Sequence, residues 1–109
     1  MAETGSHDQV GKDFDASVNM TSAALKEWLT TDKSLAVGQK SDAAGESTGH
    51  ESGRHIVRML ETARGKWHDA DWEHAGKVVG YIKRHLAQRP DTVAGSRWEA
   101  SLKNWGHQP

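Results

Sequence analysis

The stretch WEHAGKVVGYIKRHLAQRP, residues 72–90, decides the expected fold because its pattern is that of a long amphipathic helix. Apolar side chains recur along one arc of about 120°, the width of a stripe that packs against a core. These side chains are Trp72, Ala75, Val78, Val79, Ile82 and Leu86. Asp69 is placed to be the N-cap, and Pro90 ends the helix because proline lacks an amide hydrogen. The chain is therefore expected to be organised around one central helix over about residues 69–88.

A neighbouring arc of the same helix is basic and aromatic. It carries, in angular order, Arg84, Lys77, Gln88, Tyr81, His74 and His85. Lysine and arginine can replace the counterions of phosphates, and glutamine, arginine and tyrosine can reach base edges in a groove. The predicted nucleic-acid contacts are Lys77, Tyr81, Arg84, His85 and Gln88, with Arg89, Arg97 and Lys103 on phosphates if the last helix folds back. The alternative is a solvated helix face whose cations pair with the acidic first half of the chain.

Charge is unevenly distributed along the 109 residues. Residues 1–53 carry four Lys/Arg and nine Asp/Glu, a net charge of −5, whereas residues 54–109 carry ten and six, a net charge of +4. Such an asymmetry indicates either a basic binding face or two parts of one fold that attract each other.

The absence of cysteine excludes disulfides, thiolate catalysis and cysteine-ligated metal sites. No apolar run approaches the roughly 20 residues of a membrane span, and the first residues lack a signal-peptide pattern. We therefore expect a cytoplasmic protein.

The other segments also favour helices. Residues 1–12 are polar and are expected to be a disordered lead-in, and residues 13–19 form a short helix. A helix over 22–30 begins at the N-cap Thr21, one further turn is placed at 33–37, and a Gly/Ser-rich loop spans 38–49. Another amphipathic helix covers 50–64. Ser96 and Glu99 form a capping box for the last helix, and Gly106 suits its left-handed end.

No segment alternates like a β-strand, so the expected fold class is all-α. Residues 13–109 are predicted to form a compact single domain of four to five short helices. Within it, Gly76 and Gly80 are expected to allow close approach of another helix or of an indole such as Trp98 or Trp105. Trp67 is the indole expected to be exposed, and the other four are expected in the core.

Catalytic and metal-binding patterns are absent or incomplete. The string HESGRH, residues 50–55, resembles a zinc-protease motif, but its histidines are five apart and diverge around a helix by about 140°. The string GQKS, residues 38–41, lacks the preceding glycines and the strand of a phosphate-binding loop. A histidine cluster formed only in three dimensions stays open as a minor alternative. We expect no metal, no cofactor and no enzymatic activity.

Four segments together resemble a known family. They are WLTTDKSLAVGQK (28–40), GESTGHESGRHIV (45–57), KVVGYIKRHLAQRP (77–90) and WEASLKNWGHQP (98–109). The family is the one catalogued as domain of unknown function 3140, and the resemblance covers about residues 14–109. It implies, at most, a loose label of DNA binding and no catalytic residues. The family usually has glutamate where this chain has Ala24, so the capping box with Thr21 is incomplete.

The sequence thus favours a small nucleic-acid-binding protein, with DNA and a nucleoid-associated role as the first expectation. The alternative is a protein-interaction or oligomerisation module that uses exposed tryptophan and the surface around Gly76 and Gly80.

Overall fold

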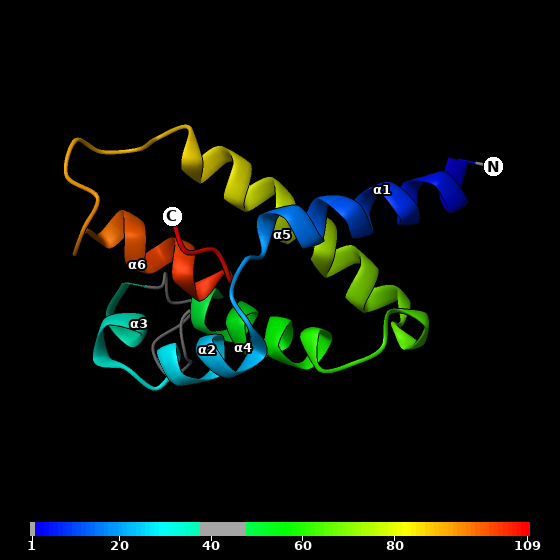
Figure 1. Ribbon diagram of the computed structural model, residues 1–109, viewed down its shortest axis with the longest axis horizontal. Helices are drawn as coiled ribbons and strands as arrows, with labels where there is room; N and C mark the ends of the chain where they lie inside the picture. Colours follow the sequence, from blue (N-terminus) through cyan, green and yellow to red (C-terminus); the bar gives the residue numbers. More distant parts are fainter. Residues whose placement is uncertain (1, 38–47) are drawn as a thin grey trace.

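The computed structural model describes residues 2–37 and 48–109, and every regular element in these ranges is helical. The elements are α1 (Ala2–Ser17), α2 (Ser22–Trp28), α3 (Asp32–Val37), α4 (Thr48–Leu60), the 3-10 turn η1 (Arg64–Lys66), α5 (Asp69–Leu86) and α6 (Arg97–Asn104) (Figure 1). The predicted all-α class is confirmed. None of these helices is both long and apolar enough to cross a membrane.

The central helix exists as predicted and is the longest element, α5. Its cap lies one residue earlier than expected, because the backbone N–H of His68 donates to Asp71 Oδ2 at 3.0 Å. The middle of the predicted apolar stripe is buried, as expected: Ala75, Val78, Val79 and Ile82. Leu86, however, is 38% exposed, since the last turn of α5 extends past the helices that cover its middle (Figure 1).

Helix α1 lies across α5 and continues back to Ala2, through the segment for which we expected disorder (Figure 1). His7, Val10 and Phe14 are the ring-bearing and apolar side chains of α1 that pack on the rest of the fold. The spacing i, i+3, i+7 places these side chains on one face. The His7 ring stacks on Trp72 with 4.4 Å between centroids. This stripe is hard to recognise in the sequence because one of its members is a histidine.

Trp67 is buried, with 8% of its surface exposed, which contradicts the expectation of an exposed indole. It meets Phe14 and Trp72 edge to face, at 5.3 and 4.9 Å between ring centroids. Its indole N–H donates to the carbonyl oxygen of Met59 at 3.2 Å, and the Arg64 guanidinium lies 4.4 Å from its centroid. The docking of α1 therefore covers an indole that polar neighbours in the sequence made look exposed.

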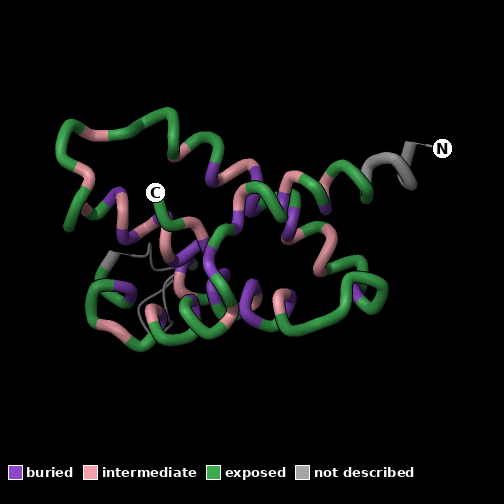
Figure 2. The backbone as a smooth tube through the Cα atoms, viewed as in Figure 1, coloured by how far each residue is buried: buried purple, intermediate pink, exposed green. Residues whose placement is uncertain are grey.

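The remaining helices pack around one cluster of buried side chains, with α2 against α4 and both α3 and α4 against α6. Figure 2 shows the buried positions on the inner sides of these helices and the exposed connection between α5 and α6. The N-caps Thr21 and Ser96 are confirmed, since their hydroxyls accept from Ala24 N at 3.1 Å and Glu99 N at 3.0 Å. Residues 38–47 of the expected loop lie outside the described residues.

The end of α6 is fixed by Gly106, whose φ of +85° confirms the predicted left-handed turn. Its carbonyl oxygen accepts from the N–H groups of Asn19 and Met20, at 3.1 and 3.2 Å. A Cβ at this position would come within 3.0 Å of Val18 Cγ1. The segment between α1 and α2 is thus held directly against the C-terminal turn.

Candidate nucleic-acid interface

Two basic side chains, Lys77 and Arg84, are exposed on one side of α5, about 20° apart at about 100° per residue, with the carboxylate of Glu73 one turn before Lys77. Gln88 is exposed in the turn that follows the helix, and we call Lys77, Arg84 and Gln88 the α5 strip. The strip is about 120° or more around the helix from Trp72. Among the described residues, neither Lys77 nor Arg84 forms an ion pair. The two charges are therefore presented to solvent.

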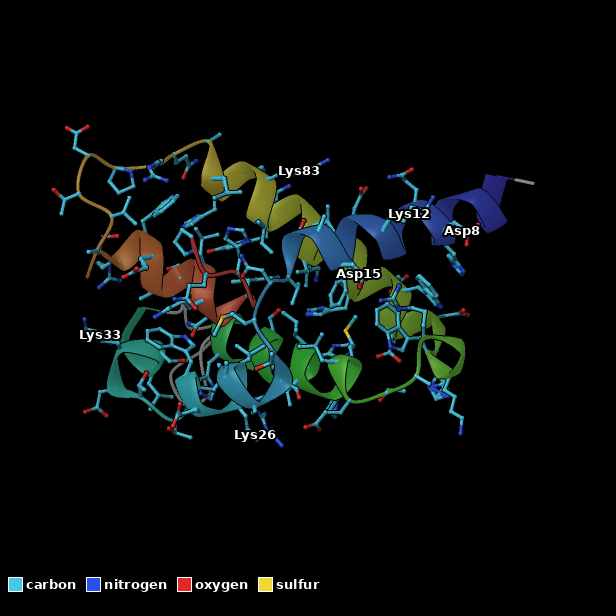
Figure 3. All side chains as sticks on the ribbon, viewed as in Figure 1. Asp8, Lys12, Asp15, Lys26, Lys33 and Lys83 are labelled. Atoms are coloured by element: carbon cyan, nitrogen blue, oxygen red, sulfur yellow. The ribbon has the colours of Figure 1, made fainter. Side chains whose placement is uncertain are left out.

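The acidic helix α1 packs on a different side of α5. The His7 ring of α1 stacks on Trp72 of α5, and the carboxylate of Asp15 pairs with Arg64 at 2.7 Å. Figure 3 shows Asp8 and Asp15 along α1, and it shows Lys83 extending from α5 away from the rest of the fold. Among the described residues of the acidic first half, none pairs with Lys77 or Arg84.

The glycines of α5 do not have the role expected from the sequence. A Cβ built at Gly76 would have nothing within 4 Å, and one at Gly80 would meet only the guanidinium of Arg84, at 3.2 Å. No helix or indole of the described chain approaches them, because α6 packs on the other side of α5. Gly80 instead leaves room for the Arg84 side chain to fold back over the helix.

Tyr81 and His85 are half-buried in a column of stacked rings between α5 and α6. The column continues through the neighbouring histidines of α4 and α5. Its successive members, with centroid separations, are His55, His74 (4.3 Å), Trp105 (6.0 Å), Tyr81 (4.1 Å), His85 (5.0 Å) and Trp98 (6.0 Å). Trp98 meets the end of α5 and Trp105 its middle, so α6 folds back antiparallel to α5. The column uses much of the surface that Tyr81 and His85 could offer to a ligand.

Burial sets the charge state of this column. It lowers the pKa of His74 from 6.5 to about 4, helped by the nearby charges of His55 and Lys77. Burial likewise lowers the pKa of His85, whose Nε2 is buried and has no partner among the described atoms. Burial also raises the pKa of Tyr81. At pH 7 His74, His85 and Tyr81 are neutral, so the permanent charge of the strip comes from Lys77 and Arg84.

The other predicted phosphate contacts are dispersed. The Arg89 guanidinium lies 6.0 Å from the Trp98 centroid, and Arg97 is exposed at the first position of α6. The Lys103 ammonium lies 4.7 Å from the Trp28 centroid, on the side of α6 that faces α2. Lys103 therefore does not share a face with the α5 strip.

A pocket of about 350 Å³ lies beside the strip, between α4 and α5 and next to the end of α6. Its lining includes Ser52, His55 and Arg58 from α4, His74 and Lys77 from α5, and Trp105. The Ser52 hydroxyl is 2.8 Å from His74 Nε2, and His55 Nε2 is 2.8 Å from Asp71 Oδ1. These bonds and the stacking of the two histidines fix the floor of the pocket.

Sequence reasoning missed this pocket. Its lining comes from three separate segments, residues 51–58, residues 74–77 and Trp105, and helical periodicity in each segment gives no signal of their meeting. The hypothesis of a composite histidine cluster came closest to this pocket, because the rings of His55 and His74 stack on each other. Within the described residues, however, no group of three or more histidine, aspartate or glutamate side chains could hold a metal ion.

The chain belongs to the family described as "Protein of unknown function (DUF3140)", whose profile matches residues 13–103. The resemblance found in the four sequence segments is thereby confirmed. Neither the curated proteins nor the solved structures contain a match to this chain.

Proposed function

We propose that this member of the DUF3140 family is a small cytoplasmic nucleic-acid-binding protein, with DNA as its expected ligand and no catalytic role. The observation that supports this most is the α5 strip. Two permanent cations and an amide, Lys77, Arg84 and Gln88, are exposed together, and the acidic helix α1 packs elsewhere. Arg58, across the pocket from Lys77, extends the positive surface onto α4.

This arrangement suits contacts with phosphates better than reading of a base sequence. Lysine and arginine bind phosphate oxygens and release counterions, whereas Gln88 is the one side chain of the strip suited to a bidentate contact with adenine. Binding should therefore be modest in affinity, weak in sequence preference and steeply dependent on salt.

Fluorescence anisotropy with labelled duplex and single-stranded DNA, at two salt concentrations, tests the proposal. We expect binding at low salt that weakens as salt increases. The Lys77→Glu/Arg84→Glu variant should bind at least tenfold more weakly, because two attractive contacts with phosphate become repulsive.

The matched control is Lys33→Glu/Lys83→Glu, which changes net charge by the same amount. Lys33 lies on α3, Lys83 lies on α5 about 100° around the helix from the strip, and both are exposed (Figure 3). The control should retain most of the affinity. Absence of binding at micromolar protein and low salt, or equal losses in the two variants, would rule the proposal out.

A protein-interaction or oligomerisation role is the second candidate. It is favoured by Gly76, which lowers helix propensity although no atom of the described chain would lie within 4 Å of a Cβ there. If a second chain packs there, light scattering should give a dimer mass that the Gly76→Leu variant reduces to that of a monomer. If the unsubstituted protein has the mass of a monomer, the hypothesis of self-association through this surface is ruled out.

A further inference from the structure

The pocket between α4 and α5 is the strongest feature that a role in duplex binding leaves unexplained. Its volume, about 350 Å³, is in the range of sites for small ligands. A straight duplex lying along the α5 strip would present phosphate diesters at the surface, and it would not need a pocket with a built floor. The chemistry of the lining therefore indicates what else could enter.

Two cations face the pocket from different helices. Arg58 and Lys77 are both exposed, and neither forms an ion pair within the described part of the chain. A carboxylate, that of Glu51, also lines the pocket, together with Arg54. The permanent charges of the lining are therefore predominantly positive. An arginine and a lysine on two sides of one pocket can together bind an anion that carries more than one negative charge.

The floor and wall are polar and aromatic. Ser52 is 4% exposed, and its hydroxyl is paired with His74 Nε2, while Asp71 holds His55 by an ion pair or hydrogen bond of 2.8 Å. The rings of His55 and His74 stack at 4.3 Å, and Trp105 closes the pocket beside them. Hydroxyl and imidazole groups can exchange hydrogen bonds with phosphate oxygens. The faces of the Trp105 indole are stacked on His74 and Tyr81, so Trp105 lines the pocket as a fixed wall.

We propose that this pocket binds a phosphate monoester, with Arg58 and Lys77 on its oxygens and Trp105 as part of the pocket wall. A monoester has a charge of about −1.5 to −2 at pH 7, whereas a diester has only one negative charge. The pocket therefore prefers a terminal phosphate to the internal phosphates of a strand. The monoester is that of a free nucleotide or that of the 5′ end of a nucleic acid.

NMR titration of the ¹⁵N-labelled full chain tests this, with inorganic phosphate, adenosine 5′-monophosphate, dimethyl phosphate and adenosine at constant ionic strength in chloride. We expect saturable shifts for the amides of Ser52 and Lys77 and for the Trp105 indole with the first two compounds. Dimethyl phosphate and adenosine should bind at least tenfold more weakly. Equal binding of monoester and diester, or no saturable shift at these positions, overturns the proposal.

Variants separate this site from the proposed duplex surface. Arg58→Gln/Lys77→Gln should weaken phosphate binding about tenfold or more, as expected for loss of charged hydrogen bonds, while Lys26→Gln/Lys83→Gln should leave it unchanged. Arg84→Glu should retain phosphate binding while weakening DNA binding. If the protein binds phosphate but not DNA, only the proposed DNA-binding function is contradicted. If it binds DNA but not phosphate, only the phosphate site is contradicted. Unaltered phosphate binding in a folded Arg58→Gln/Lys77→Gln protein overturns the assignment.

The source of the monoester is distinguished with one oligonucleotide carrying either a 5′-phosphate or a 5′-hydroxyl. Tighter binding of the phosphorylated strand, lost in Arg58→Gln/Lys77→Gln, identifies a nucleic-acid end. If only adenosine 5′-monophosphate and phosphate give the shifts, the ligand is a free phosphate monoester.

Discussion

At the residue scale, two glycines in helices lead to opposite predictions. A Cβ at Gly53, in the middle of α4, would lie 2.6 Å from the carbonyl oxygen of Asn104 and 2.7 Å from Leu29 Cδ2. A Cβ at Gly76 would meet nothing. We expect Gly53→Ala to destabilise the fold by about 1–3 kcal/mol through overpacking. Gly76→Ala should stabilise it by up to about 1 kcal/mol, since alanine favours the helix.

Urea unfolding followed by circular dichroism measures both changes. The two variants make the same chemical substitution in the interior of a helix, so each serves as the control for the other. A stabilising Gly53→Ala would contradict the close approach of α4 to the end of α6. A destabilising Gly76→Ala would show that the open side of α5 is covered in solution.

At the element scale, α2, α3 and α6 are joined by the buried side chain of Asn104, which is 1% exposed. Its Oδ1 accepts from Trp28 Nε1 at 2.7 Å and from the Ser34 hydroxyl at 2.6 Å. Its Nδ2 donates to the carbonyl oxygen of Ser34 at 3.0 Å. Short helices such as α3, with six residues, depend on such tertiary contacts because they are marginal in isolation.

We therefore expect Asn104→Ala to lower the free energy of unfolding by at least about 2 kcal/mol, because it leaves buried partners unsatisfied. Asn104→Asp should be at least as damaging at pH 7, since it removes the donor and buries a charge. Denaturant titration provides the measurement, and a change below about 0.5 kcal/mol, the usual range for surface substitutions, would contradict the network.

At the scale of the whole molecule, the ring column makes stability depend on pH. The pKa of His74 is about 4 in the fold and 6.5 ordinarily, so between these values the unfolded chain binds the proton and the folded chain does not. The contribution of the neutral His74 ring to the free energy of unfolding is complete above pH 6.5, and it is lost as the pH falls towards 4. His85, whose pKa is also lowered by burial, acts in the same direction.

We expect the free energy of unfolding to fall by about 1–2 kcal/mol between pH 7 and pH 5 on account of His74, because solvent at this half-buried ring screens part of the effect. Urea titrations at several pH values measure this dependence. In His74→Gln the slope should be smaller, because this ring no longer takes up a proton on unfolding, and the part due to His85 should remain. Equal stability of the unsubstituted protein at pH 7 and pH 5 would contradict a buried, neutral His74.

The sequence by itself determined the local features of this fold. Helical spacing identified the buried stripe of α5, and the caps Thr21 and Ser96 and the left-handed Gly106 followed from hydrogen-bonding needs at helix ends. The exposure of Lys77 and Arg84 on one side of α5 also follows from helical spacing, because an exposed arc depends on one helix alone.

Only the tertiary structure decided which helix meets which face. It buried Trp67 under α1, left Gly76 open, and placed Arg58 of α4 beside Lys77 of α5. Periodicity shows which side of a helix is apolar, but the partner of that side depends on packing between segments distant in the chain. The exposed cations of α5 could therefore be predicted from the sequence, whereas the pocket beside them could not.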